Sequence, residues 1–247
     1  HDWDHELSDL SPEYFQSELR EAEALLKEAN SIDEGSLSFD EQIDLEIMKL
    51  QLGKIIFSDS LRYNDLFDYE QRPSAGDVLI HSLLYLFLKD PRPSFVRLDA
   101  INSRVAKFPV FLENYKPTLK KIIGRWKDIE LEEVSGAPDL LENILVWAER
   151  ENYSKLIELK HNIEVAKNSM QDYLAYLRTL AVEENFTIGA DNAQRLVNLN
   201  GLDLSLSEIF QIAQDFFVTQ EEKIASLIAD LKIKNKLAES FDHGEVL

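Results

Sequence analysis

The sequence predicts an all-α fold, an irregular array of about eight to ten long amphipathic helices and helical hairpins. Glycine and proline are scarce, with 8 and 7 residues among 247, so few positions interrupt a helix. Hydrophobic residues make up 45% of the chain and recur at helical spacing, which supplies enough apolar surface for a sizeable core. Both observations argue against a loop-rich or all-β protein.

The first two helices have clear start signals. Ser11 is placed to cap a helix that has Pro12 at its first position. Ser38 and Glu41 have the spacing of a capping box at the start of the second helix. Because the apolar residues of this second helix cover a wide arc, we expect it to be contacted on two sides.

The middle of the chain is predicted to contain shorter helices separated by proline. Residues 75–89 form the third helix. Its apolar run at residues 78–88 is the longest in the chain, yet it is about half as long as a membrane span, so we interpret it as a buried helix. A fourth helix begins near Phe95, and Pro109 opens or kinks a fifth.

Helix-breaking residues become fewer towards the second half of the chain. A turn at residues 124–126 leads into a short piece, and the segment "SGAPD" at 135–139 starts another helix. From Tyr153 to about Glu184 there is hardly a helix-breaking residue. One helix of about 30 residues, on the order of 45 Å long, is therefore expected there.

Closely spaced stop and start signals follow the long helix. A short helix is expected at residues 191–199, and the pair at 200–201, Asn-Gly, ends it because both residue types tolerate a left-handed backbone. Ser205 and Glu208 form a second capping-box pattern. From there the last helix is expected to run to about Lys234.

The helices are interpreted as one helical domain over residues 1–247, or as the N-terminal half of a larger helical protein. Residues 238–247 are predicted to be a frayed tail. The sequence does not begin with a basic segment followed by an apolar one, so no secretion signal is expected. Cysteine is absent, which excludes disulfides and cysteine nucleophiles and slightly favours a cytoplasmic location.

The charge is strongly negative and unevenly distributed. A net charge of −20 repels nucleic acid and anionic membrane surfaces, so nucleic acid is not expected as a partner. Residues 71–130 nevertheless contain 11 basic and 6 acidic side chains, whereas residues 1–70 contain 5 and 19. The basic middle either packs against the acidic N-terminal region or contacts an anion or a peptide carboxylate. The first interpretation is favoured, since charged faces are usually only solvated.

Two histidines are the candidates for metal chemistry. Glu158, His161 and Glu164 follow one another at three-residue intervals, and the Glu-x-x-His spacing occurs in helix bundles that bind two metal ions. No second Glu-x-x-His exists, so a solvated helix face with local ion pairs is the favoured interpretation. His81 lies in the most apolar helix, where a hydrogen-bonded core histidine is more common than a ligand.

Sequence motifs of the common enzyme classes are absent. The chain contains no His-Glu-x-x-His zinc motif, no glycine-rich phosphate loop and no Gly-x-Ser-x-Gly elbow. Acidic residues are so abundant that any pair could be read as an acid–base dyad, and surface charge is the simpler explanation. No catalytic, cofactor-binding or metal residue is assigned in this chain.

Two short patterns carry a resemblance to a known family. A Leu-Pro-x-Phe-Leu pattern is matched by Phe108, Pro109, Phe111 and Leu112, with Phe in place of the first Leu. The second pattern is an aliphatic-Gly pair, a leucine-rich helix, a Gly-Leu turn and an acid-capped helix. It is matched by Ile188, Gly189, Leu196, Gly201, Leu202 and Glu208. With these patterns in this order, most of the chain resembles the N-terminal half of a bacterial family catalogued as domain of unknown function 885 (DUF885).

The resemblance implies a role that depends on a second half. Proteins of that family are about twice as long, helical, and similar to thermolysin-like zinc metallopeptidases, with the zinc motif and its second glutamate in the later half. None of those positions exists in this chain, so zinc is implied only for the missing half. By this resemblance, residues 1–247 form a non-catalytic scaffold and one wall of a substrate cleft.

Two hypotheses follow. A scaffold needs a partner, either a zinc-bearing C-terminal half or a peptide, and predicts an exposed apolar surface, expected along residues 78–88 and 153–184. A stand-alone helical module for protein binding or oligomerisation instead predicts a stable monomer or a symmetric homodimer without an open seam.

Overall fold

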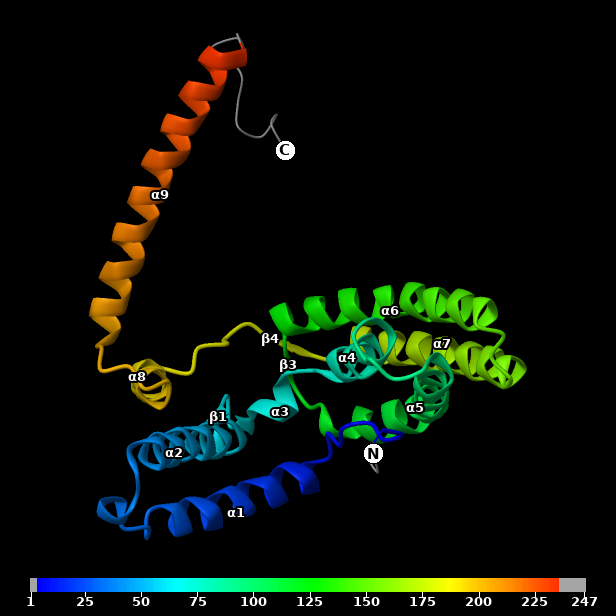
Figure 1. The fold of residues 1–247 in the computed structure, drawn as a ribbon, viewed down its shortest axis with the longest axis horizontal. Coiled ribbons are helices and arrows are strands. Elements are labelled where there is room, and N and C mark those ends of the chain that lie inside the picture. Colours follow the sequence, from blue (N-terminus) through cyan, green and yellow to red (C-terminus); the bar gives the residue numbers. More distant parts are fainter. Residues whose placement is uncertain (1–3, 236–247) are drawn as a thin grey trace. The chain divides into compact units, whose positions relative to one another are not determined.

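A computed structural model describes residues 4–235, in which the chain forms nine α-helices and four strands of two residues each (Figure 1). The predicted all-α class is confirmed. The chain divides into two compact units, one ending at Ile188 and the other beginning at Gly189. In the part of the chain that the structure describes, no helix is long and apolar enough to cross a membrane.

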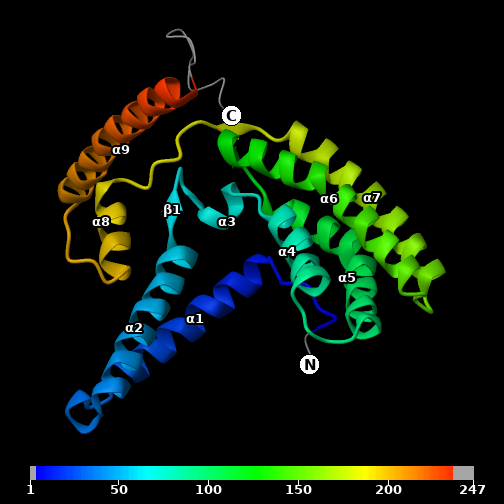
Figure 2. The same ribbon diagram turned by 45° about the horizontal axis from the view of Figure 1, so that its top comes forward.

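The first unit begins with a helical hairpin. Its elements are α1 (Pro12–Ala29), the 3-10 turn η1 (Glu34–Ser36) and α2 (Phe39–Ser60). Both predicted starts are confirmed: Tyr14 N donates to Ser11 Oγ at 3.1 Å, and Ser38 and Glu41 form the capping box. The two helices pack along each other and bury Ala22 and Leu52 (Figure 2).

A tight hairpin and a short helix follow. They comprise β1 (Arg62–Tyr63), β2 (Leu66–Phe67) and α3 (Asp68–Gln71). Asn64 and Asp65 connect the strands with φ of 52° and 64°, the left-handed pair that suits the twist of a two-residue hairpin. Gln71, fully buried, donates to the carbonyl oxygens of Tyr63 at 2.7 Å and Leu66 at 3.2 Å. These bonds fix the hairpin against α3.

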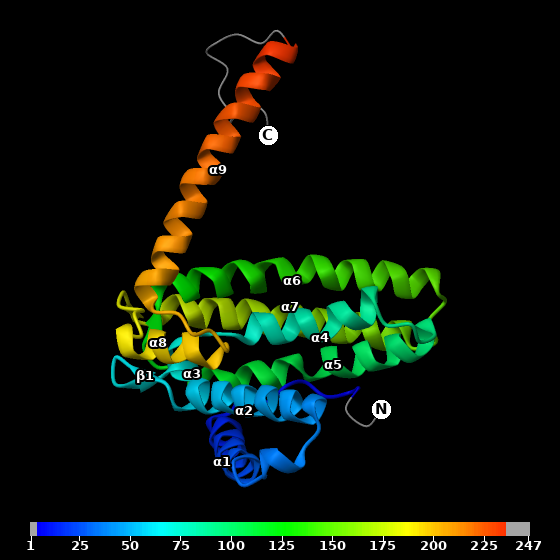
Figure 3. The same cartoon turned by 60° about the vertical axis from the view of Figure 1, so that its left-hand side comes forward.

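Four long helices form the core of the first unit. They are α4 (Ala75–Leu88), α5 (Ser94–Tyr115), α6 (Gly124–Arg150) and α7 (Leu156–Thr179), with the 3-10 turn η2 (Lys116–Thr118) after α5. They run side by side (Figure 3), with α5 on α7 and α6 on both α4 and α7. The buried residues of this core include Leu79, Leu83, Ile101, Phe108, Leu112, Leu141, Ile144, Ile163, Met170 and Tyr173.

Two predicted breaks are wrong, because α5 continues through Pro109 and α6 continues through Gly136 and Pro138. Inside a helix, proline removes one backbone hydrogen bond and its ring crowds the carbonyl of the preceding turn. Around Pro109, Phe108 and Leu112 are fully buried, and this packing holds the helix together across the break. Local propensity is thus overridden by tertiary contacts.

The long helix α7 is shorter than expected at both ends. Asn152 has a left-handed φ of 53°, which separates α6 from α7. Beyond Thr179 the chain becomes extended and forms β4 (Val182–Glu183), which pairs in parallel with β3 (Ile122–Ile123). Ile122 and Ile123 are buried, so this pairing ties the end of α7 to the core.

The second unit follows the prediction closely. It contains α8 (Ala190–Leu199) and α9 (Leu206–Asn235). Gly189 and Gly201 have φ of 82° and 72° and flank α8, in the conformation that favours glycine. Ser205 N donates to Glu208 Oε2 at 2.7 Å, and Glu208 N donates to Ser205 Oγ at 3.2 Å, so the second capping box is confirmed. The predicted frayed tail, 238–247, lies outside the described residues.

Candidate functional site

The proposed metal ligands are not brought together. Asn102 Nδ2 donates to Glu158 Oε1 at 2.7 Å, whereas His161 is exposed and Glu164 lies 3.6 Å from Lys167 Nζ. Among residues 4–235, no group of three or more His, Asp or Glu side chains is placed to hold a metal ion. The three residues lie on a solvated helix face, on which Glu164 is paired with Lys167.

His81 is not a core histidine, and this prediction is wrong. Its ring is exposed and its Nδ1 lies 2.7 Å from Asp77 Oδ1, one helical turn earlier. The helix α4 is apolar nearly all round, but only one of its faces, with Leu79 and Leu83, is buried. The opposite face carries His81 and Tyr85, which is 57% exposed.

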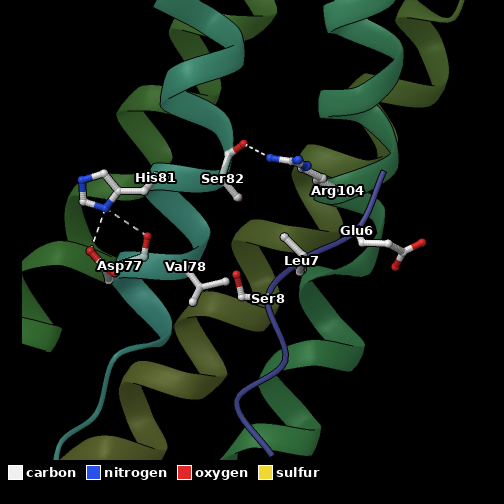
Figure 4. Close-up of a pocket in the computed structure, with 8 residues that line it drawn as sticks. All are labelled: Glu6, Leu7, Ser8, Asp77, Val78, His81, Ser82 and Arg104. Atoms are coloured by element: carbon white, nitrogen blue, oxygen red, sulfur yellow. Dashed lines mark hydrogen bonds and ion pairs between the residues drawn. The ribbon is translucent and has the colours of Figure 1, made fainter. Parts of the chain in front are cut away.

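A pocket of about 440 Å³ lies between α4, α5 and the N-terminal segment (Figure 4). It is lined by Glu6, Leu7, Ser8, Asp77, Val78, His81, Ser82 and Arg104. The neighbouring His81, Asp77 and Ser82 invite comparison with a catalytic triad. However, Ser82 Oγ donates to Leu79 O at 3.0 Å, and His81 points away from it in Figure 4. The pocket therefore lacks a paired nucleophile and base.

Arg104 in this pocket holds the N-terminal segment. Its Nε donates to Asp4 O at 2.8 Å, and its Nη1 donates to Ser82 O. Burial lowers the pKa of Arg104 from its ordinary value. Because these bonds run to backbone carbonyls of the N-terminal segment and of α4, the guanidinium group holds these two parts of the chain together.

The basic middle of the chain pairs with the acidic N-terminal region, as predicted. Lys107 Nζ lies 2.6 Å from Glu6 Oε2, and Arg92 forms an ion pair with Asp4. Lys120 lies 3.1 Å from Glu70. The basic residues of this segment are thus largely used within the fold.

A buried carboxyl group sits at the start of α4. Glu130 of α6 is 1% exposed, and its Oε1 accepts from Gly76 N at 2.9 Å and from Tyr173 Oη at 2.8 Å. Within the described residues its Oε2 has no hydrogen-bond partner. Burial raises the pKa of Glu130 to about 7, against the lowering effect of these two donors. The helix α4 has no side-chain cap of its own, so Glu130 caps it from a distant element.

The helix α9 exposes many large apolar side chains. In the segments where an exposed apolar surface was expected, residues 78–88 and 153–184, Tyr85, Leu88 and Ile157 are 57%, 60% and 87% exposed. Phe210, Phe217, Ile224 and Leu231 recur every seven residues and are 63%, 66%, 48% and 42% exposed. Other sides of the helix expose Ile212, Phe216 and Val218 at 57%, 60% and 55%. These seven residues are termed the α9 surface.

The first half of α9 is acidic. Residues 206–222 contain four acidic side chains and no basic one. Within the described part of its unit, α8 is the element that packs against α9, near its start, where Gln194 Nε2 donates to Leu204 O at 2.8 Å. The rest of the α9 surface faces no other element among residues 189–235.

The apolar recurrence on α9 can be recognised in the sequence, whereas the contacts of Glu130 cannot. The seven-residue recurrence along α9 is visible in the sequence and indicates a docking helix. Glu130, in contrast, lies 54 residues from Gly76 and 43 from Tyr173. No local pattern joins residues so far apart.

Comparison with known proteins gives one family and one solved fold. A family model described as "Bacterial protein of unknown function (DUF885)" matches residues 1–245. A search of curated proteins finds no match. The chain is similar in fold to a Shewanella oneidensis protein described as "a putative lipoprotein of unknown function", with a TM-score of 0.73 and 14% identity. The likeness covers 94% of this chain and 43% of that one, so this chain spans less than half the length of that protein.

Proposed function

The chain belongs to the bacterial family of unknown function DUF885, and we propose that it serves as the non-catalytic helical scaffold of a longer protein of that family. The chain spans 43% of the similar solved protein, which leaves room for a second part at least as large. In this proposal the second part carries the chemistry and the helices described above form one wall of a substrate cleft.

The α9 surface is the observation that carries the proposal. A helix with apolar residues on several sides is normally buried in a larger structure. Phe210 and Phe216 lie about 600° apart in helical rotation, or 120° from each other around the axis, and both are at least 60% exposed. Contiguous exposed apolar surface of this kind marks an interaction site. The second part of the protein is the proposed occupant.

The resemblance to zinc metallopeptidases suggests the chemistry of that second part. Residues 4–235 of this chain offer no set of metal ligands, so no step of hydrolysis is assigned to them. The contribution of this chain is to position and cover a substrate by shape.

A stand-alone oligomerisation module is the second candidate. The seven-residue spacing of Phe210, Phe217, Ile224 and Leu231 favours it, because a helix with one such stripe can pair with another copy. In a pair of α9 helices, however, only one side of each helix is covered, so Phe216 would remain exposed.

Peptide hydrolysis distinguishes a scaffold from an enzyme. We expect residues 1–247 to cleave no unstructured peptide substrate, with or without added zinc, because the described residues contain no group of three or more His, Asp or Glu side chains placed to hold a metal ion. A family protein that contains both parts serves as the positive control. Zinc-dependent cleavage by this chain alone would contradict the proposal.

A further inference from the structure

The exposed side of α2 carries an apolar stripe that is separate from the α9 surface. Phe39, Ile43 and Ile47 follow at four-residue intervals and are 74%, 39% and 50% exposed. The stripe is about 12 Å long, at 1.5 Å per residue. Beside it lies a groove of about 480 Å³, lined by Phe39, Ile43, Gln42, Glu34, Glu46 and Lys49. This stripe and groove are termed the α2 groove.

The α2 groove is held in shape by its own hydrogen bonds. Gln42 Nε2 donates to Glu34 O at 2.9 Å and to Leu37 O at 3.2 Å, which fixes η1 beside α2. Ser38 N donates to Glu41 Oε2 at 2.8 Å, which fixes the first turn and with it the position of Phe39. A preformed surface loses little conformational freedom when a ligand binds.

The charge around the α2 groove is strongly negative. Residues 12–60, which form the hairpin, contain 12 acidic and 4 basic side chains. Lys49 is already paired with Glu34 at 2.6 Å. Asp40, Asp44 and Glu46 form no ion pair with any residue that the structure describes. The stripe is thus bordered by carboxylates whose charge is uncompensated.

We propose that the α2 groove binds a cationic amphipathic helix of a partner protein. Apolar side chains at four-residue spacing on that helix cover Phe39, Ile43 and Ile47, as in other helix-in-groove complexes. Lysine or arginine side chains on its flanks face Asp44 and Glu46.

Charge disfavours a second copy of this chain and an anionic membrane as occupants. A second copy of this chain carries the same net charge of −20, and its hairpin is also acidic, so two α2 grooves repel each other. Anionic membrane surfaces are repelled for the same reason. The proposal depends on the α2 groove alone and holds whether or not α9 docks on a second part.

Peptide titration of the chain tests the proposal. The probe is a helical peptide of about 16 residues with leucine at four-residue spacing and lysine on both flanks, and the comparison peptide has glutamate in place of lysine. We expect the lysine peptide alone to bind, more weakly at higher salt. Ile43→Gln and Glu46→Lys should each weaken binding about tenfold or more.

Matched variants on α6 separate the groove from general acidity. Val146→Gln changes a valine that is 43% exposed, and Glu132→Lys reverses an exposed carboxylate, so both should leave affinity unchanged. Phe39→Gln, at a side chain 74% exposed, replaces Ile43→Gln if circular dichroism shows that the latter is unfolded. The proposal would be overturned if the α6 variants weakened peptide binding as much as the α2 variants, if both peptides bound equally, or if neither peptide bound. So would an Ile43-dependent dimer in sedimentation equilibrium.

Discussion

At the scale of single residues, Glu130 is the most unusual group in the chain. Its carboxyl accepts hydrogen bonds from a helix N-terminus and a buried tyrosine, yet burial raises its pKa to about 7 from an ordinary value of 4.5. Groups that face it are Tyr173 on α7, Tyr115 on α5 and Glu133 on α6. None of them carries a positive charge, so the carboxylate has no compensating cation.

The raised pKa of Glu130 makes stability depend on pH. Below pH 4.5 the group is protonated in the folded and unfolded states; between 4.5 and 7 it keeps its proton only when folded. The free energy of unfolding should therefore fall as pH rises through this window, by on the order of 3 kcal/mol in total. Urea unfolding at several pH values measures the change.

Glu130→Gln isolates this effect, because glutamine resembles the protonated acid. The variant should lose the part of the decrease between pH 4.5 and 7 that Glu130 causes, whereas Glu132→Gln, at an exposed position of the same helix, should keep it. The smaller part due to Asp59, whose pKa burial raises to about 6, should remain in both variants. Identical pH profiles for the wild type and Glu130→Gln would show that Glu130 is not the titrating group.

At the scale of elements, the sequence predicted helix starts far better than helix interiors. Ser11, Ser38 and Ser205 all begin helices where expected, since a cap is a contact between residues three apart. The continuation of α5 through Pro109 depends on neighbours from α7, which lie far away in sequence. The parallel pairing of Ile122 with Val182 is equally non-local.

The close approach of α4 to α6 gives a second prediction. A Cβ on Gly76 would lie 3.0 Å from Glu133 Cβ and 3.1 Å from Val134 Cγ2, so Gly76→Ala should destabilise the fold by about 1–3 kcal/mol. Gly136 lies inside α6 with no atom within 4 Å of such a Cβ. Gly136→Ala should therefore stabilise by about 0.5–1 kcal/mol, through helix propensity. Thermal unfolding of both variants checks the pair, and an equal effect at the two glycines would argue against this packing.

At the scale of the whole molecule, the family and fold class were predictable from the sequence, whereas the exposure of α9 was not. The order of short sequence patterns along the chain indicated the family DUF885, which the family model confirms over residues 1–245. The apolar surface that a second half would cover was expected along residues 78–88 and 153–184. In the structure Leu79 and Leu83 of α4 are buried in the core whereas Leu88 is 60% exposed, and α9 exposes Phe210 and Phe217 at 63% and 66%.

Sequence could not decide between these helices, because both are rich in apolar residues. The difference lies in their neighbours: one face of α4 packs against α5 and α6, whereas within its own unit α9 packs against α8 near its start. Which apolar helix is covered is a property of the assembled fold. The same reasoning explains why His81 was misplaced, since its helix is buried on one face only.

Hydrogen exchange of α9 tests the central claim most directly. The backbone amides of residues 210–231 should exchange about 100-fold or more slowly in a protein that contains both parts than in residues 1–247 alone, because the second part covers the α9 surface. The amides of α7, buried within the first unit, provide the internal reference and should exchange equally in both samples. Equal exchange of α9 in the two proteins would contradict the scaffold function.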